Sequence, residues 1–267
     1  MMVAKQATIS LSAGIRGIGF WAPGLPDWSS ARAFARNGER PTEAALRPSP
    51  QLLAPNERRR SPPTVAVALE VAQAACADAA RDPRTLPSIF ASMHGDLAIT
   101  DYMCATLAKS PQDISPTRFH NSVHNAAAGY WTIGTGCMQA TTAISAFDAT
   151  FAQGLIEALT QLATGTEAVL LVAYDGDAPG PLGPIENTEG LLGGALVLTR
   201  DAGSGDRLRA TLTAGARVAA RGPLARLLPG NAMSPMLPLF DALATGGDLA
   251  VLQAGPAQLL RVELAHA

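Results

Sequence analysis

One cysteine in a glycine-flanked turn has the surroundings of a nucleophile. Cys137 follows the turn 134–136 (Gly-Thr-Gly) and precedes residues 138–162, whose apolar positions predict a long helix. The start of a helix carries about half a positive charge and free N–H groups, which lower the pKa of a thiol. Cys137 is therefore the candidate nucleophile. The alternative interpretation is steric: Cys137 would simply be a small residue, as is needed where a strand turns into a packed helix.

A cysteine nucleophile needs a base or a charged partner, a role that histidine fills most often. The sequence has four histidines, of which three precede Cys137. The polar block 120–125, with His120 and His124, lies just before residues 130–135, a predicted strand that leads to Cys137. This block suits the lining of a pocket or an interface, and equally the ordinary surface of a protein.

Two further motifs give weaker signals. Residues 14–19 have the spacing GxxGxG, which differs from the GxGxxG of dinucleotide loops, and no helix is predicted after them. We interpret them as a turn within an opening strand. Arg58-Arg59-Arg60 fits the docking of an acidic carrier domain or of a phosphopantetheine phosphate, and equally a solvated loop end.

Apolar periodicity predicts the elements that position these residues. Predicted strands cover residues 8–20, 88–92, 130–135, 168–174, 193–198, 208–214, 249–253 and 259–264, and predicted helices cover 64–81, 97–107, 138–162 and 236–243. The proline-rich residues 21–63 predict a long surface excursion. Strands that alternate with helices indicate an α/β fold with a mostly parallel core sheet and helices on both faces.

Composition excludes several classes of protein. Of the 267 residues, 48% are apolar and 16% are charged, which excludes a disordered chain. The net charge of -2 gives no electrostatic basis for binding nucleic acid or an anionic membrane. No apolar stretch is long enough to span a membrane. The three cysteines lack metal-binding spacing, so we expect no metal site, reduced thiols and a cytoplasmic location.

Thr135-Gly136-Cys137, with Ala143-Ile144 six and seven residues after the cysteine, resembles the Thr-Ala-Cys nucleophile motif of the β-ketoacyl synthase family. Three other stretches resemble family segments and occur in the same order as in the family: the Arg-rich turn and Ala-rich helix at 58–80, the apolar strand at 168–173 and the Gly-Ala-Leu-Val-Leu strand at 194–198. The resemblance therefore covers about residues 9–200.

The resemblance implies a truncated thiolase-like α/β fold. Residues 1–205 would form the N-terminal ketosynthase half, a mixed sheet flanked by helices. Residues 206–267 would form a short C-terminal α/β remnant that completes the fold.

Two departures from the family change the expected function. The family's two catalytic histidines lie in its second half, whereas this sequence has no histidine between His124 and His266. Tyr174-Asp175 replace a Gly-Gly of the family. With this shortening, the block 119–131 most resembles the short chain-length-factor-like proteins of aryl polyene and xanthomonadin-type biosynthesis. In that group a complete ketosynthase performs the Claisen condensation, and its short partner shapes the pocket into which the polyene grows.

The resemblance also implies roles for individual residues. Cys137 would stand at the nucleophile-equivalent position, in a group whose members need not keep that cysteine. The tunnel residues would be Met138, Gln139 and Phe147. The interface residues would be His120, Asn121, His124, Asn125, Tyr130 and Trp131.

We therefore expect a chain-length-factor subunit without independent condensing activity. It would form a heterodimer with a complete β-ketoacyl-ACP synthase in fatty-acid- or polyketide-type chain elongation. Acyl carrier protein would be a further partner, whose phosphopantetheine thioester arrives through the ketosynthase, with no cofactor bound to this chain. Two alternatives stay open: an autonomous Cys137-dependent acyltransferase or thioesterase that uses His120 or His124, and a structural scaffold in which Cys137 is incidental.

Overall fold

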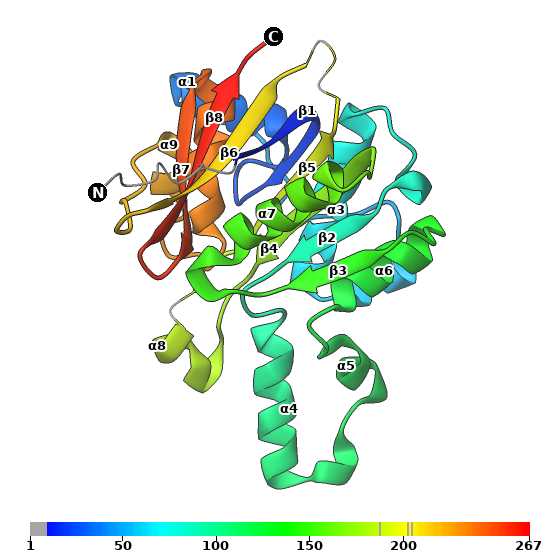
Figure 1. The fold of residues 1–267 in the computed structure, drawn as a ribbon. Helices are drawn as coiled ribbons and strands as arrows, with labels where there is room; N and C mark the ends of the chain where they lie inside the picture. Colours follow the sequence, from blue (N-terminus) through cyan, green and yellow to red (C-terminus); the bar gives the residue numbers. More distant parts are fainter. Residues whose placement is uncertain (1–9, 187, 202, 204) are drawn as a thin grey trace, which may run out of the picture.

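The structure is a computed structural model that describes residues 10–186, 188–201, 203 and 205–267, so residues 8 and 9 of the predicted opening strand lie outside it. The described strands form one eight-stranded sheet (Figure 1). They are β1 (Ser10–Trp21), β2 (Ser88–Ala91), β3 (Thr141–Ile144), β4 (Ala168–Asp175), β5 (Leu192–Thr199), β6 (Arg207–Ala214), β7 (Leu249–Gly255) and β8 (Gln258–Ala265). The α-helices are α1 (Trp28–Asn37), α2 (Pro55–Arg60), α3 (Pro63–Asp78), α4 (Leu97–Lys109), α5 (Pro116–Asn121), α6 (Ala126–Thr135), α7 (Thr150–Ala163), α8 (Gly183–Glu186), α9 (Pro223–Leu227) and α10 (Leu237–Thr245). The short 3-10 helices are η1 (Pro83–Thr85), η2 (Pro111–Asp113), η3 (Phe147–Ala149), η4 (Gly180–Leu182) and η5 (Ser234–Met236).

The sheet is mixed, with the strand order β3-β2-β4-β5-β1-β6-β8-β7. β2 runs parallel to β3 and β4, and the other neighbouring pairs are antiparallel. The prediction of a mostly parallel sheet is wrong, because β5 returns beside β4 in the opposite direction and β7 and β8 form a hairpin. A mixed sheet flanked by helices, as the family resemblance implied, is confirmed.

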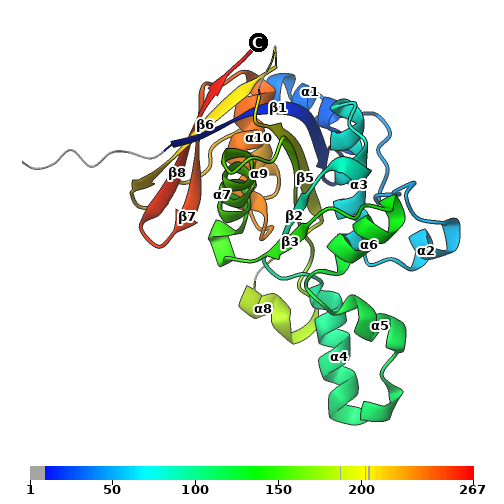
Figure 2. The same ribbon diagram turned by 45° about the vertical axis from the view of Figure 1, so that its right-hand side comes forward.

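Helices cover both faces of the sheet, as predicted (Figures 1 and 2). All residues of β4 are buried, and successive side chains point to opposite faces. Leu171 packs in the core that also contains α7 and α10, whereas Leu170 packs in the core of α3 and α6. The continuous apolar run of β4 is therefore explained by burial on both sides.

Two glycines of β1 let α3 pack directly against the sheet. The GxxGxG segment is part of β1, with a bulge between Ile15 and Gly17, so its interpretation as a turn is wrong. A Cβ atom on Gly19 would overlap the carbonyl oxygen of Val71, and one on Gly17 would overlap that of Ala75. Glycine is needed at both positions because the backbone of α3 comes so close.

Gly19→Ala is expected to lower the free energy of unfolding by about 2–3 kcal/mol, because the backbone of α3 must move away from β1. The matched control is Gly129→Ala in α6, where no described atom outside the helix backbone lies within 4 Å of the added Cβ. This control should gain about 0.5–1 kcal/mol from helix propensity. Urea denaturation measures both changes, and equal effects would contradict the tight packing of α3 on β1.

Residues 126–149 fold differently from the prediction. Residues 126–135 form helix α6 rather than a strand, and Gly136 ends that helix with a φ of +70°. The strand comes later as β3, and α7 begins at Thr150 rather than at residue 138. Three consecutive alanines at 126–128 favour the helix, and the threonines of β3 favour the strand.

The C-terminal residues extend the same sheet. β6 pairs with β1, β8 pairs with β6, and β7 forms the far edge. Strands from residues 1–205 and 206–267 are hydrogen-bonded neighbours in this sheet, so the sheet marks no boundary between the two parts. The division into these two units stays a prediction.

A helical arm, residues 97–121, projects from the body of the protein (Figures 1 and 2). It consists of α4, η2 and α5, and α4 agrees with the predicted helix at 97–107. Tyr102 links its two sides, because its hydroxyl accepts a hydrogen bond from the amide of Ser115 at 3.1 Å. The guanidinium of Arg118 stacks on the same ring, with Cζ 3.9 Å from the ring centroid.

Candidate functional site

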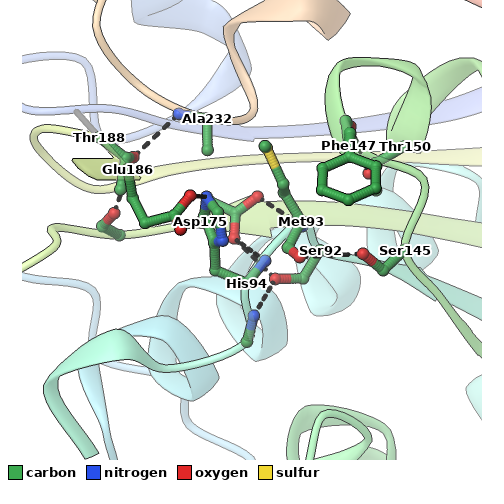
Figure 3. Close-up of polar contacts among 12 residues, drawn as sticks. Ser92, Met93, His94, Ser145, Phe147, Thr150, Asp175, Glu186, Thr188 and Ala232 are labelled. Atoms are coloured by element: carbon green, nitrogen blue, oxygen red, sulfur yellow. Dashed lines mark hydrogen bonds and ion pairs between the residues drawn. The ribbon is translucent and has the colours of Figure 1, made fainter. Parts of the chain in front are cut away.

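The turn between β3 and α7 has a geometry that presents one side chain. β3 is an edge strand parallel to β2, and the chain passes from it through η3 into the 14-residue helix α7. Phe147, at the tip of this turn, has a φ of +50°, which is uncommon for a bulky residue. The residue is 79% exposed, and Figure 3 shows its ring beside Thr150.

Hydrogen bonds hold Phe147 in this conformation. The amide of Ala146 donates to Oγ1 of Thr150 at 2.9 Å, and that hydroxyl donates to the carbonyl of Phe147 at 2.6 Å. The hydroxyl of Ser145 donates to the carbonyl of Met93 at 2.9 Å, which ties the turn to the chain after β2 (Figure 3). A non-glycine residue in the left-handed region costs about 1–3 kcal/mol and persists only where its surroundings fix it. The turn is therefore a fixed feature of the fold.

The chemistry open to this turn is limited by the side chain that it presents. α7 begins without a side-chain cap, and the amide of its first residue, Thr150, donates to the carbonyl of Phe147. Nucleophile elbows place a reactive residue at such a sharp strand-to-helix turn. The phenyl ring of Phe147 has no atom that can attack a thioester or transfer a proton. The turn can fill space with an apolar group but cannot form an acyl-enzyme.

A buried carboxylate lies where β2 and β4 end. Asp175 is 0% exposed and accepts hydrogen bonds from the Ser92 hydroxyl at 2.7 Å, the Met93 amide at 2.8 Å and the His94 amide at 3.2 Å (Figure 3). The amide of Gly95 in turn donates to Oγ of Ser92 at 2.8 Å. Burial raises the pKa of Asp175 to about 7, and the three hydrogen bonds to its carboxylate oppose the shift. This cluster fixes the loop after β2 beside the Phe147 turn.

Asp175 is expected to make the free energy of unfolding fall between about pH 4 and pH 7. Because its pKa is raised in the folded state, the folded protein holds a proton that the unfolded chain has already released in this window. The stabilisation is complete below the unfolded pKa and is lost as the pH rises through about 7, with a slope of at most about 1.4 kcal/mol per pH unit.

Urea denaturation of the wild type and of Asp175→Asn across this range checks the prediction. The difference in the free energy of unfolding between the wild type and Asp175→Asn should shrink as the pH rises, because the asparagine side chain does not titrate. The pKa of His94 is lowered by burial and acts in the opposite direction, but it does so in both proteins and cancels in the difference. An advantage that stays constant with pH would contradict the assignment.

Two histidines lie beside the carboxylate cluster. Nε2 of His94 lies 3.6 Å from Oε2 of Glu186, and burial lowers the pKa of His94 while Glu186 partly offsets that effect. Nε2 of His124 donates to the carbonyl of Ser92 at 2.8 Å, which joins the chain after the arm to the end of β2. The His124 contact is a structural hydrogen bond.

Cys137 follows a helix instead of beginning one. It comes directly after the end of α6 and is 4% exposed. Its amide donates to the carbonyl of Thr132 at 3.0 Å, and its Sγ lies 3.6 Å from the carbonyl oxygens of Arg84 and Leu86. The prediction that Cys137 begins a long helix is wrong, because residues 126–135 are helical and β3 intervenes before α7. The sulfur is buried against backbone rather than presented to a substrate.

The predicted tunnel residues lie on the surface around the edge strand. Met138 is 94% exposed and Phe147 is 79% exposed, and Gln139 is exposed as well. Ile133, at the end of α6, is 81% exposed. Met138 and Phe147 thus leave exposed apolar side chains shortly before and after β3 in the chain, and the unpaired edge of such a strand is able to bind another strand.

The predicted interface residues divide between the surface and the interior. His120, Asn125 and Tyr130 line a groove of about 360 Å³ beside α6. Asn121 is 4% exposed, at the base of the arm. Trp131 is 0% exposed, so its prediction as an interface residue is wrong. The reason is that α6 turns one side toward α3, and Trp131 lies on that side.

Sequence reasoning missed the cluster of Asp175 and Ser92. A signal was present, because Asp175 is a charged residue that ends a fully apolar strand. Such a carboxylate must be paired or protonated when it is buried. Its partner Ser92 lies 83 residues away and carries no such signal.

Within the described part of the chain, no group of three or more His, Cys, Asp or Glu side chains could hold a metal ion. Among the helices of the described residues, none is both long and apolar enough to cross a membrane.

Comparisons with known proteins agree with this fold. A chain of the complex between the ketosynthase ApeO and its chain length factor ApeC from Xenorhabdus doucetiae has a TM-score of 0.75 and 23% identity, over 95% of this chain and 99% of that chain. The ishigamide ketosynthase/chain length factor matches with a TM-score of 0.70 and 15% identity, over 95% and 99% of the two chains. The type II acyl-carrier protein and ketosynthase complex AntDE:AntF matches with a TM-score of 0.70 and 11% identity, over 97% and 100%.

These similarities show a shared fold, and the truncated thiolase-like architecture implied by the sequence is confirmed. No curated protein matches the chain at a significant level. Residues 27–227 match the family described as Beta-ketoacyl synthase, N-terminal domain. Because this match spans well over half of the sequence, the chain belongs to the family of β-ketoacyl synthase N-terminal domains.

Proposed function

We propose that the protein is a chain-length-factor-like subunit that pairs with a complete β-ketoacyl synthase, performs no condensation itself and shapes the tunnel for the growing chain. One observation carries the proposal: in a ketosynthase fold, the fixed turn at the start of α7 presents Phe147 and no nucleophile. We assign Ser145-Ala146-Phe147, rather than residues 135–137, to the place of the family's Thr-Ala-Cys motif. A phenyl ring in that place suits a wall of the tunnel.

The similar solved structures support this function. The ApeO structure contains a ketosynthase in complex with its chain length factor, and the ishigamide structure is a ketosynthase/chain length factor. This chain covers nearly the full length of the matching chain in each. Aryl polyene-type or polyketide-type chain elongation is therefore the reaction class that we propose.

The free edge of β3 is the surface through which we propose that the partner binds. The edge strand leaves backbone groups without partners in the sheet, and Met138 and Phe147 expose apolar side chains shortly before and after it in the chain. Strand addition supplies main-chain hydrogen bonds, and the flanking apolar area supplies the hydrophobic contribution. His120, Asn125 and Tyr130 would extend this interface along the groove beside α6.

An acyl carrier protein is the second partner that we propose. The AntDE:AntF structure contains an acyl-carrier protein with its ketosynthase, which supports carrier-bound substrates for this fold. The phosphopantetheine thioester would enter through the ketosynthase subunit, since Phe147 cannot accept an acyl group. Chemistry on carrier-bound thioesters fits the cytoplasmic location expected from the sequence.

The experiment that tests the proposal is the mass of the protein in solution, alone and after coexpression with a ketosynthase encoded beside its gene. A stable 1:1 complex, with the single chain aggregating or self-associating, is the expected result. A monodisperse single chain that does not bind the ketosynthase would overturn the proposal.

The alternative of an autonomous Cys137 enzyme has no support in the geometry, since the sulfur is buried against the Arg84 and Leu86 carbonyls. Turnover of acyl thioesters by the single chain, abolished by Cys137→Ala, would favour it. The same substitution should leave the product of the heterodimer unchanged.

A further inference from the structure

The turn that presents Phe147 is attached to the rest of the protein on two sides. On one side, the Ser145 hydroxyl donates to the carbonyl of Met93, in the segment after β2. On the other side, Nη1 of Arg217 lies 2.6 Å from Oδ2 of Asp148, the residue that follows Phe147. Arg217 comes after β6, 69 residues further along the chain. Phe147 therefore lies between two tethered residues, one of which is held by the C-terminal part of the protein.

The ion pair supplies a positive charge that the neighbourhood of the turn in the sequence lacks. There is no Lys or Arg between Arg118 and Arg200, so the counter-ion of Asp148 comes from a distant segment. The side chain of Arg217 is 61% exposed and that of Asp148 is 50% exposed. A pair this exposed contributes little to the stability of the fold. Its consequence is local, because it ties the turn to the loop after β6.

A second contact from the C-terminal part reaches the first turn of α7. The side-chain amide of Gln153 donates to the carbonyl of Ala254, near the end of β7, at 2.6 Å. β7 also lies beside η3, the short helix of the turn. The loop after β6 begins on the same hairpin, since the amide of Gly215 donates to the carbonyl of Ala257 at 3.0 Å. The β7–β8 hairpin and this loop therefore form one support beside the turn.

The conformation of Phe147 requires support from outside the turn. Its φ of +50° is unfavourable for a bulky residue and persists only where the surroundings fix it. The two hydrogen bonds of the Thr150 hydroxyl lie within the turn and would move with it. Among the side-chain hydrogen bonds described for residues 145–149, those that reach other elements belong to Ser145 and Asp148. These two contacts determine where the ring stands relative to the sheet.

We propose that Arg217 is a positioning residue for Phe147, and that its ion pair with Asp148 keeps the ring in one place in the tunnel. This inference rests on the proposed function, because the position of the ring affects the product only if the ring is a tunnel wall. Without the ion pair, the turn would open in part of the molecules and the ring would move aside. Some chains would then grow past it. No covalent step is involved.

Hydrogen exchange of the single chain tests the positioning role without a partner protein. The amides of Ala146, Ala149 and Thr150 form hydrogen bonds within the turn and report its opening. In Arg217→Gln these amides should exchange at least about threefold faster than in the wild type. The melting temperature should stay within about 4 °C of the wild type, because the pair is exposed. Unchanged exchange in the turn would overturn the proposal.

Further variants separate the ion pair from a general change of charge. Asp148→Asn should accelerate exchange as Arg217→Gln does, and the double variant should exchange no faster than either single variant, because all three lack the same contact. Arg217→Lys keeps the charge and should keep most of the protection. The matched control is Arg221→Gln in the same loop, because the Arg221 side chain forms no ion pair among the described residues. Equal exchange by Arg217→Gln and Arg221→Gln would reject the role of the ion pair.

The products of the heterodimer show whether the position of the ring matters for elongation. Arg217→Gln should give the longer product of Phe147→Ala beside the wild-type product. Added to Phe147→Ala, it should lengthen the product no further, since no ring is left to position. Further lengthening in that background would show that Arg217 acts by another route and would overturn the proposal. If Phe147→Ala itself leaves the product unchanged, the tunnel wall of the proposed function fails, and the exchange rates by themselves decide whether Arg217 positions the turn.

Discussion

Thr141→Pro is expected to weaken binding of the ketosynthase partner at least about tenfold while leaving the fold intact. Ser88 donates its amide to the carbonyl of Ala140 at 3.0 Å, and Ser92 donates to Ile144 at 3.1 Å. Even-numbered residues of β3 therefore face β2, and the amide of Thr141 faces the free edge. Proline at this position removes an edge donor and blocks strand addition without breaking a β2–β3 hydrogen bond.

The size of this effect follows from the hydrogen bond that the partner loses. A partner carbonyl left unpaired in the interface costs about 1–3 kcal/mol, and each 1.4 kcal/mol is tenfold in affinity. The matched control is Thr141→Val, which also loses the contact between the Ser88 and Thr141 hydroxyls but keeps the edge amide. Titration of each variant with the ketosynthase by size-exclusion chromatography and calorimetry gives the comparison. Wild-type affinity of the proline variant would remove β3 from the proposed interface.

Phe147→Ala is expected to lengthen the product of the heterodimer by at least one elongation unit. The ring stands at the tip of a fixed turn, so in the complex it would occupy a defined volume of the tunnel. Removing it leaves room for the growing chain, whereas the cost to stability is small because the side chain is exposed in the single chain. Met138→Ala should act in the same direction. Mass spectrometry of the products from the reconstituted complex measures the change.

Two controls separate the tunnel effect from a general loss of fit. Phe147→Leu keeps most of the apolar volume and should give the wild-type product. Leu249→Ala changes an exposed apolar residue on β7, at the other edge of the sheet, and should also leave the product unchanged. An unaltered product length from well-folded Phe147→Ala would show that this ring does not line the tunnel.

The buried strands and the main helix could be predicted from the sequence. The predicted strands 168–174 and 193–198 agree with β4 and β5 within a residue at either end, and α3 lies within the predicted helix apart from its first residue. A strand covered on both faces requires a continuous apolar run, which is visible locally. The alternation in β6 was equally informative, because one of its faces is exposed.

The turn that presents Phe147 could not be located in this way. Residues 135–137 and 145–147 share a local pattern. In each, a small residue precedes the candidate site residue, and a long apolar stretch follows. The choice between the two segments depends on whether residues 126–135 form a helix. That helix is stabilised by the burial of Trp131 against α3. Packing between distant segments therefore decided the local structure, as it often does for short apolar runs.

The sequence by itself determined the family, the buried strands of the core and the absence of a catalytic histidine between His124 and His266, because residue identity and local burial patterns are enough for these. The tertiary structure alone decided which residue stands at the start of α7. It also decided that Ser92 meets Asp175 across 83 residues and that Trp131 is fully buried against α3. These contacts arise from strand pairing and from helix packing, and the free energy of such long-range packing is not contained in any short window of sequence.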